Sequence, residues 1–121
     1  MQIEHVDLLS VHSTDLDRSR RFYLETLGLP LDNDRGSGFE VWAGQLCLSV
    51  WNPTGAGMDL GASPAHVALH VDDVAAARAE LEARGVAFEG ATFDSGVCHM
   101  AFFRDPDGNA FMLHHRYAPK P

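Results

Sequence analysis

One pattern occurs twice in the sequence, and this repeat decides the fold. Residues 5–29 read HVDLLSVHSTDLDRSRRFYLETLGL, and residues 66–86 read HVALHVDDVAAARAELEARGV. Each copy begins with His-Val, alternates between apolar and polar residues, passes aspartates, and then shows the spacing of an amphipathic helix that ends at a glycine. The repeat therefore predicts two related units, each opening with a strand and a helix.

The ends of both helices carry recognisable signals. Gly28 and Gly85 follow the helical patterns and suit the left-handed residue that terminates a helix. In the first copy Leu16, Tyr23 and Leu27 share one helical face, and the alanine-rich second copy has high helix propensity. Side chains able to cap the N-termini are Ser13, Thr14 or Asp15 in the first copy and Asp72 or Asp73 in the second.

Short strands separated by turn residues follow each helix. We expect them at 29–34, 38–43 and 45–51 in the first half, and at 86–90, 97–104 and 110–116 in the second. Asp105-Pro106-Asp107-Gly108 makes the last hairpin, where Gly108 and Asn109 tolerate positive φ. The plan is a single domain over residues 1–121: a βαβββ module at 3–51, a Gly- and Pro-rich loop at 52–64, and a second module at 65–117. An isolated module leaves a sheet face uncovered, so we expect an α+β fold in which the paired modules form a curled mixed sheet around a concave pocket.

Composition excludes several classes of function. The net charge of −8 argues against a nucleic-acid partner, because phosphate contacts need a basic face. No stretch approaches the roughly 20 apolar residues of a membrane span. Cys47 and Cys98 lack the spacing of a zinc or redox motif and lie in apolar strands, so we expect buried thiols in a reducing cytoplasm. The N-terminus has no basic stretch ahead of an apolar run, as a signal peptide would.

The sequence resembles the vicinal oxygen chelate superfamily in four features. These are the doubled unit, the His-Val that opens each half, DLDRSRRFYLETLGL after the first strand, and FFRDPDGNAFML near the end. This superfamily includes glyoxalase I, extradiol dioxygenases, fosfomycin-resistance enzymes and bleomycin-resistance binding proteins. The resemblance runs from Ile3 to about Tyr117 and implies the paired-module fold. It also implies that chains of this length form homodimers, sometimes by exchanging modules.

In metalloenzymes of this family the ligands come from the opening and last strands of each module. The matching positions here are His5, a residue near Leu48, His66 and Met112. Two histidines match, but no Asp or Glu lies between Gly44 and Met58 or after Gly108. The resemblance therefore implies His5 and His66 as candidate ligands for a divalent iron, nickel, manganese or zinc ion, with His114, His99 or water as a third.

Other side chains are expected in the same pocket because alternate residues of a strand share a face. Asp7 follows His5, His70 lies on the face of His66, and His114 follows Met112. Trp51 borders the loop and could stack on a planar ligand. The sequence pattern leaves open which face of the sheet carries His99. His12 and His115 are expected at the surface. The predicted ligand pocket therefore comprises His5, Asp7, Trp51, His66, His70, Met112 and His114.

Three functions are compatible with these residues. The first is a binding protein of the glyoxalase/bleomycin-resistance type, with a degenerate metal site and a planar or aromatic small molecule in the pocket. The second is a metal-dependent lyase or dioxygenase that uses His5 and His66. The third is metal-free acid–base chemistry by His66 or His70. The lost carboxylates favour the first function.

Overall fold

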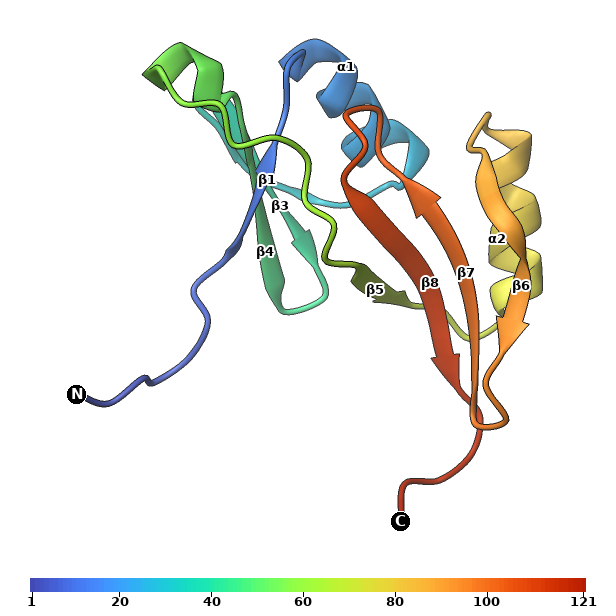
Figure 1. The fold of residues 1–121 in the computed structure, drawn as a ribbon. Coiled ribbons are helices and arrows are strands. Elements are labelled where there is room, and N and C mark those ends of the chain that lie inside the picture. Colours follow the sequence, from blue (N-terminus) through green and yellow to red (C-terminus); the bar gives the residue numbers. More distant parts are fainter. The chain divides into compact units, whose positions relative to one another are not determined.

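The computed structural model describes residues 1–121 and has an α+β fold of two βαβββ units (Figure 1). The chain divides into two compact units, Met1–Ala62 and Ser63–Pro121. Each unit contains one four-stranded mixed sheet and a helix that packs on one of its faces. No helix is long and apolar enough to cross a lipid bilayer.

In the first unit the sheet order is β1-β4-β3-β2, with β1 parallel to β4 and the other neighbours antiparallel. A helix connects β1 to β2, and it changes from α to π geometry, as the bond from the Leu27 amide to the Phe22 carbonyl shows. The elements are β1 (Leu9–His12), α1 (Leu16–Arg20), η1 (Arg21–Thr26), β2 (Leu31–Asp34), β3 (Gly38–Ala43), β4 (Leu46–Trp51) and the 3₁₀ turn η2 (Pro53–Ala56).

The core of this unit lies between the sheet and the helix. Alternate residues of β1, β4 and β3 are fully or almost fully buried, and Tyr23 of η1 covers them with no exposed surface. The Tyr23 ring packs edge-on against Phe39 at 6.2 Å between centroids. The buried sheet residues are Val11, Phe39, Val41, Leu48 and Val50. The residues between them therefore point to the other face of the sheet, here called the open face.

The second unit repeats this plan with the sheet order β5-β8-β7-β6. Ala101, Phe103, Phe111 and Leu113 are buried on the face that α2 covers through residues such as Leu81. The elements are β5 (Val67–His70), α2 (Val74–Ala83), β6 (Phe88–Asp94), β7 (Cys98–Arg104) and β8 (Ala110–Arg116).

The predicted helix ends are confirmed, with Asp15 and Asp73 as the capping residues among the candidates. Gly28 and Gly85 have positive φ angles of 68° and 93°. The predicted strands at 38–43 and 110–116 match residue for residue, and the others differ at their ends by one to four residues. Both cysteines are buried free thiols, as expected.

The expectation that His5 belongs to the first strand is wrong, because β1 begins only at Leu9. Its partner strand explains the difference. Leu9 pairs with Leu48 in a parallel register, and β4 itself begins at Leu46 after the turn at Gly44. Residues 1–6 would have to pair beyond the start of β4, so they find no strand partner within the unit.

The turn at 105–108 holds the last hairpin together by a buried network. The Gly108 amide donates to the Asp105 carbonyl at 3.0 Å, and Gly108 has a φ of 89°. Asn109, however, does not adopt positive φ, contrary to expectation. It is 2% exposed, and its Oδ1 accepts a hydrogen bond from the Ser63 amide at 2.9 Å. The side chain of Asn109, rather than its backbone conformation, therefore explains its place here.

Candidate functional site

The open face of the first sheet borders a cavity of about 700 Å³. Strand register places Ser10, Ser49 and Glu40 side by side on this face. The loop after β4 and the β2–β3 turn complete the walls. The lining residues are Leu8, Ser10, Leu16, Asn33, Arg35, Ser37, Gly38, Phe39, Glu40, Ser49, Trp51, Asn52, Gly55 and Ala56. All of them belong to the first unit.

Trp51, at the end of β4, supplies the largest aromatic surface of this cavity. Its Nε1 donates a hydrogen bond to Ser10 Oγ at 2.6 Å. The His12 ring meets the indole edge-on at 5.7 Å between centroids. His12 is itself fixed, because its Nδ1 lies 2.9 Å from the Gly61 carbonyl oxygen. The indole is therefore held in place as a flat, half-buried platform, the form of side chain that binds planar rings.

Glu40 brings a carboxylate into the same cavity with only 17% of its side chain exposed. Asn33 Nδ2 donates to its Oε1 at 2.8 Å, and the Arg35 guanidinium lies 3.6 Å from that oxygen. Burial, and then the neighbouring Glu40 carboxylate, raises the pKa of the Cys47 thiol to about 11. Cys47 is consequently a neutral thiol at physiological pH and not a nucleophile. The carboxylate gives the cavity an acceptor for a cationic or hydrogen-bond-donating ligand.

Comparison with known proteins identifies the family to which this fold belongs. The family model of the Glyoxalase/Bleomycin resistance protein/Dioxygenase superfamily matches residues 2–113. The chain belongs to this superfamily. It is 34% identical to a "Probable lactoylglutathione lyase" of Vibrio parahaemolyticus serotype O3:K6, and the match covers 78% of each chain.

Solved structures give two further likenesses. TnmS3, an antibiotic binding protein from Streptomyces sp. CB03234, superposes with a TM-score of 0.78 at 34% identity, covering 96% of this chain and 98% of that one. A lactoylglutathione lyase from Agrobacterium tumefaciens superposes with a TM-score of 0.77 at 20% identity, covering 93% and 94%. The second likeness shows the shared fold alone.

The superfamily positions in this chain do not suit its usual metal ligand set. Leu48 has no exposed surface and packs on the helix side of its sheet, so its two neighbours on β4, Cys47 and Ser49, are on the open face. Met112 presents a thioether, a soft and weak ligand for hard divalent ions. Both carboxylate positions are therefore without a carboxylate.

The two histidines at superfamily positions lie in different units. His5 is exposed in the segment before β1, and its Nε2 lies 2.8 Å from Asp7 Oδ1, which is also exposed. His66 immediately precedes β5, and its ring contacts Phe102 at 5.2 Å between centroids. Their joint coordination of a metal stays a prediction.

The strand register places His70 and His114 side by side, and their part in a ligand pocket stays a prediction. His70 pairs with His114 across β5 and β8, and Met112 pairs with Ala68 and Phe102. Met112 and His114 are half-buried in the sheet. His70 is exposed, and its Nε2 lies 3.3 Å from Asp72 Oδ1.

Two histidines expected at the surface are half-buried instead. The contacts to Trp51 and Gly61 cover His12, whereas His115 lies beside His99 on β7 and contacts the His70 ring at 5.6 Å. Glu40 was not among the site residues predicted from the sequence. A charged residue between two apolar ones in a strand, here Phe39 and Val41, was the signal that could have placed it on an open face.

Proposed function

We propose that this protein binds a small planar organic molecule in the cavity of the first unit. The observation that carries the proposal is the fixed indole of Trp51 facing a space of about 700 Å³ with a single carboxylate in its wall. That volume lies within the usual 300–1,000 Å³ of ligand sites. The 34% identity to the antibiotic binding protein TnmS3 and the missing carboxylates at the superfamily metal positions support a binding role.

The chemistry of the walls indicates the class of ligand. Leu8, Leu16 and Trp51 provide apolar surface, so the body of the ligand should be flat and apolar. Glu40 favours a protonated amine or another strong hydrogen-bond donor on the ligand's rim, because the Arg35 guanidinium 3.6 Å away is 74% exposed and can turn out to solvent. The net charge of −8 attracts cations over a longer range. A planar cation should therefore bind more tightly than a planar anion of similar size.

The experiment uses the two tryptophans as an internal control. Trp42, which is 38% exposed, does not line the cavity, whereas Trp51 does. An aminoacridine cation and an anilinonaphthalenesulfonate anion are titrated into Trp42→Phe and Trp51→Phe, and tryptophan emission is recorded. Saturable quenching by the cation should occur in Trp42→Phe and disappear in Trp51→Phe. Equal quenching in both variants would refute the assignment of this cavity.

A metal-dependent enzyme of the glyoxalase or extradiol dioxygenase type is the second candidate. The 34% identity to a protein named as a lactoylglutathione lyase favours it. A divalent metal would act as a Lewis acid on neighbouring substrate oxygens. Formation or cleavage of lactoylglutathione is measured with added iron, nickel, manganese or zinc. Turnover that needs the metal and is lost in His5→Ala and His66→Ala would replace the binding role by this one.

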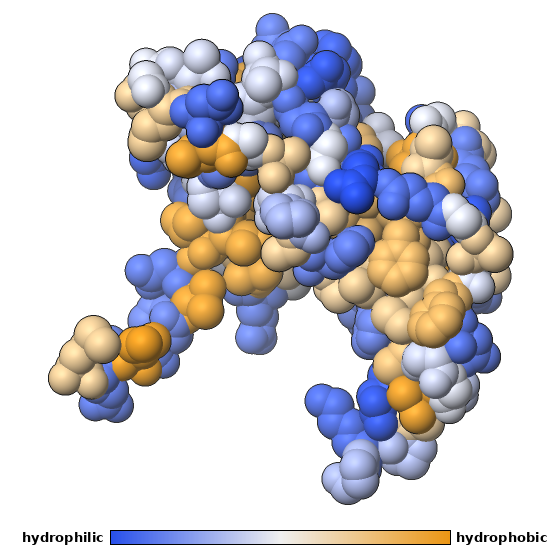
Figure 2. Space-filling model, in the orientation of Figure 1, coloured by the Kyte–Doolittle hydropathy of each residue, from blue (hydrophilic) through white to orange (hydrophobic).

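We also propose that the protein forms a homodimer through its N-terminal segment, residues 1–8. Ile3 and Val6 are 81% and 72% exposed, and this segment of mixed apolar and polar residues has no strand partner within the unit (Figure 2). Such a segment pairs readily with a strand of another chain. Light scattering after size-exclusion chromatography should give twice the chain mass, and a variant lacking residues 1–8 should give the monomer mass.

A further inference from the structure

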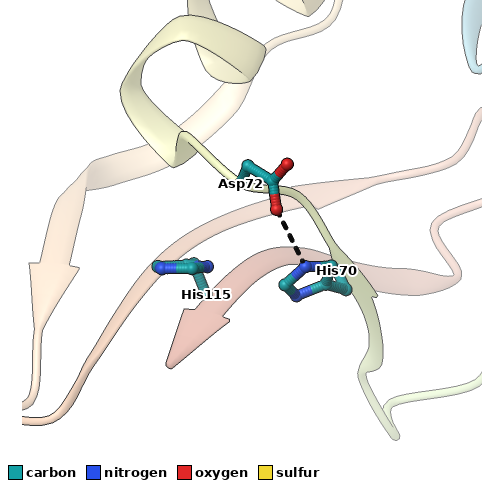
Figure 3. A group of neighbouring side chains, drawn as sticks. All are labelled: His70, Asp72 and His115. Carbon is teal, nitrogen blue, oxygen red and sulfur yellow. Dashed lines mark hydrogen bonds and ion pairs between the residues drawn. The ribbon is translucent and has the colours of Figure 1, made fainter. Parts of the chain in front are cut away.

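A second group of side chains lies at one end of the sheet of the second unit. His70 ends β5, Asp72 precedes the residue that caps α2, and His115 lies next to the last residue of β8. One ligand atom from each of the three residues lies within 4.8 Å of the others. Figure 3 shows the three side chains around one common space, with His70 bonded to Asp72.

The spacing suits a metal ion after a small movement. Zinc–nitrogen bonds of about 2.0–2.1 Å in a tetrahedral site place neighbouring ligand atoms roughly 3.3 Å apart. His70 Nε2 and Asp72 Oδ1 are already 3.3 Å apart. Their side chains are 68% and 99% exposed, so they can rotate toward His115 without displacing the core.

His115 is the fixed member of the group. Its Nδ1 is shielded from solvent and has no hydrogen-bond partner. A buried polar atom without a partner costs free energy, and such atoms are uncommon in folded proteins. Coordination through Nδ1 would give this nitrogen the partner it lacks. The orphaned nitrogen and the convergence of the three side chains are independent observations that point to the same ligand.

We infer that His70, Asp72 and His115 form a binding site for a divalent transition metal ion. Two imidazoles and one carboxylate suit zinc or nickel better than magnesium or calcium, which prefer oxygen ligands. None of the three residues occupies a superfamily ligand position, so this site is separate from the one that the fold family implies. It is also independent of the ligand cavity in the first unit.

The surroundings leave room for a further ligand on the metal. Asp72 and His115 line a cavity of about 430 Å³ together with Thr92, His99 and Tyr117. His99 lies 3.4 Å from Asp94, to which Tyr117 also donates a hydrogen bond. Three protein ligands leave at least one coordination position for water or a small chelating molecule.

The test is a calorimetric titration of the untagged, chelator-treated full chain with zinc and with nickel. The wild type should bind one ion per chain. His70→Ala and Asp72→Asn alter exposed side chains and should fold normally, and each should weaken binding by about tenfold or more, since even loss of an outer partner costs 10- to 100-fold. Asp59→Asn, at an exposed aspartate of the first unit, is the matched control and should bind as the wild type does.

A second readout examines His115, whose replacement could disturb the sheet. Cobalt absorption in the visible range reports nitrogen and oxygen ligands directly, so His115→Gln should lose that signal while its circular dichroism stays that of the wild type. If His115→Gln unfolds, the two exposed variants still decide the matter. Unchanged affinity in both His70→Ala and Asp72→Asn, or loss of binding in Asp59→Asn, would overturn the proposal.

Discussion

Replacing Asp105 should destabilise the second unit more than any surface change, because this carboxylate organises the last hairpin. It is 5% exposed. Its Oδ1 accepts from the backbone amides of Asp107 and Asn109 at 3.0 and 2.8 Å, and its Oδ2 accepts from Asn109 Nδ2 at 2.8 Å. Asp105→Ala therefore removes three hydrogen bonds and leaves their donors without this acceptor.

The magnitude follows from these bonds. A hydrogen bond to a charged group contributes about 1.5–3 kcal/mol, but the three share one acceptor and one partner residue, so their losses do not add fully. We expect Asp105→Ala to lower the free energy of unfolding by about 3–5 kcal/mol, near the upper end for single substitutions. Asp105→Asn keeps one acceptor oxygen but turns an amide group toward Asn109 Nδ2. Asn109 cannot flip to relieve this without losing its bond to Ser63, so we expect about 2 kcal/mol.

Urea unfolding followed by far-ultraviolet circular dichroism measures these changes. Tryptophan fluorescence is unsuitable, because both tryptophans, Trp42 and Trp51, lie in the first unit. Asp59→Ala, an exposed aspartate, serves as the control and should stay within about 0.5 kcal/mol of the wild type. If Asp105→Ala were no more destabilising than this control, the network would contribute nothing and the reasoning would be refuted.

Three further predictions concern the first unit. The Arg20 guanidinium donates to both oxygens of Asp34 and holds the pKa of that carboxyl below 3.8. The stabilisation from this pair is therefore present above pH 3.8 and is lost on further acidification. In thermal unfolding below pH 3.8, Asp34→Asn should lose less stability on acidification than the wild type does. The pKa of Cys47 is raised to about 11, so the stability of the folded state should fall as pH rises from 9.0 toward 11. For the same reason, Cys47 in the native protein should resist alkylation until the protein is unfolded. Gly38→Ala should cost about 1–3 kcal/mol in urea unfolding, because the new Cβ would lie 2.9 Å from the Val50 carbonyl oxygen, and a wild-type midpoint would contradict this.

Local signals in the sequence predicted much of the fold. The caps at Asp15 and Asp73 and the glycines that end both helices depend only on neighbouring residues, so their chemistry is readable along the chain. The first strand was misplaced because its extent depends on a partner strand far away in sequence. His5 has a strand-like pattern but no strand beside it within the unit.

In the candidate sites, too, some features follow from the sequence and others only from the tertiary structure. The sequence by itself determined the doubled βαβββ plan, the absence of both carboxylates at the superfamily positions and the aromatic residue Trp51 beside the loop. Only the tertiary structure decided that Glu40 enters the cavity of Trp51 and that His70, Asp72 and His115 converge. Periodicity tells which residues share a face of one element, but convergence depends on register and twist between elements distant in sequence, and one strand's own pattern does not contain that information.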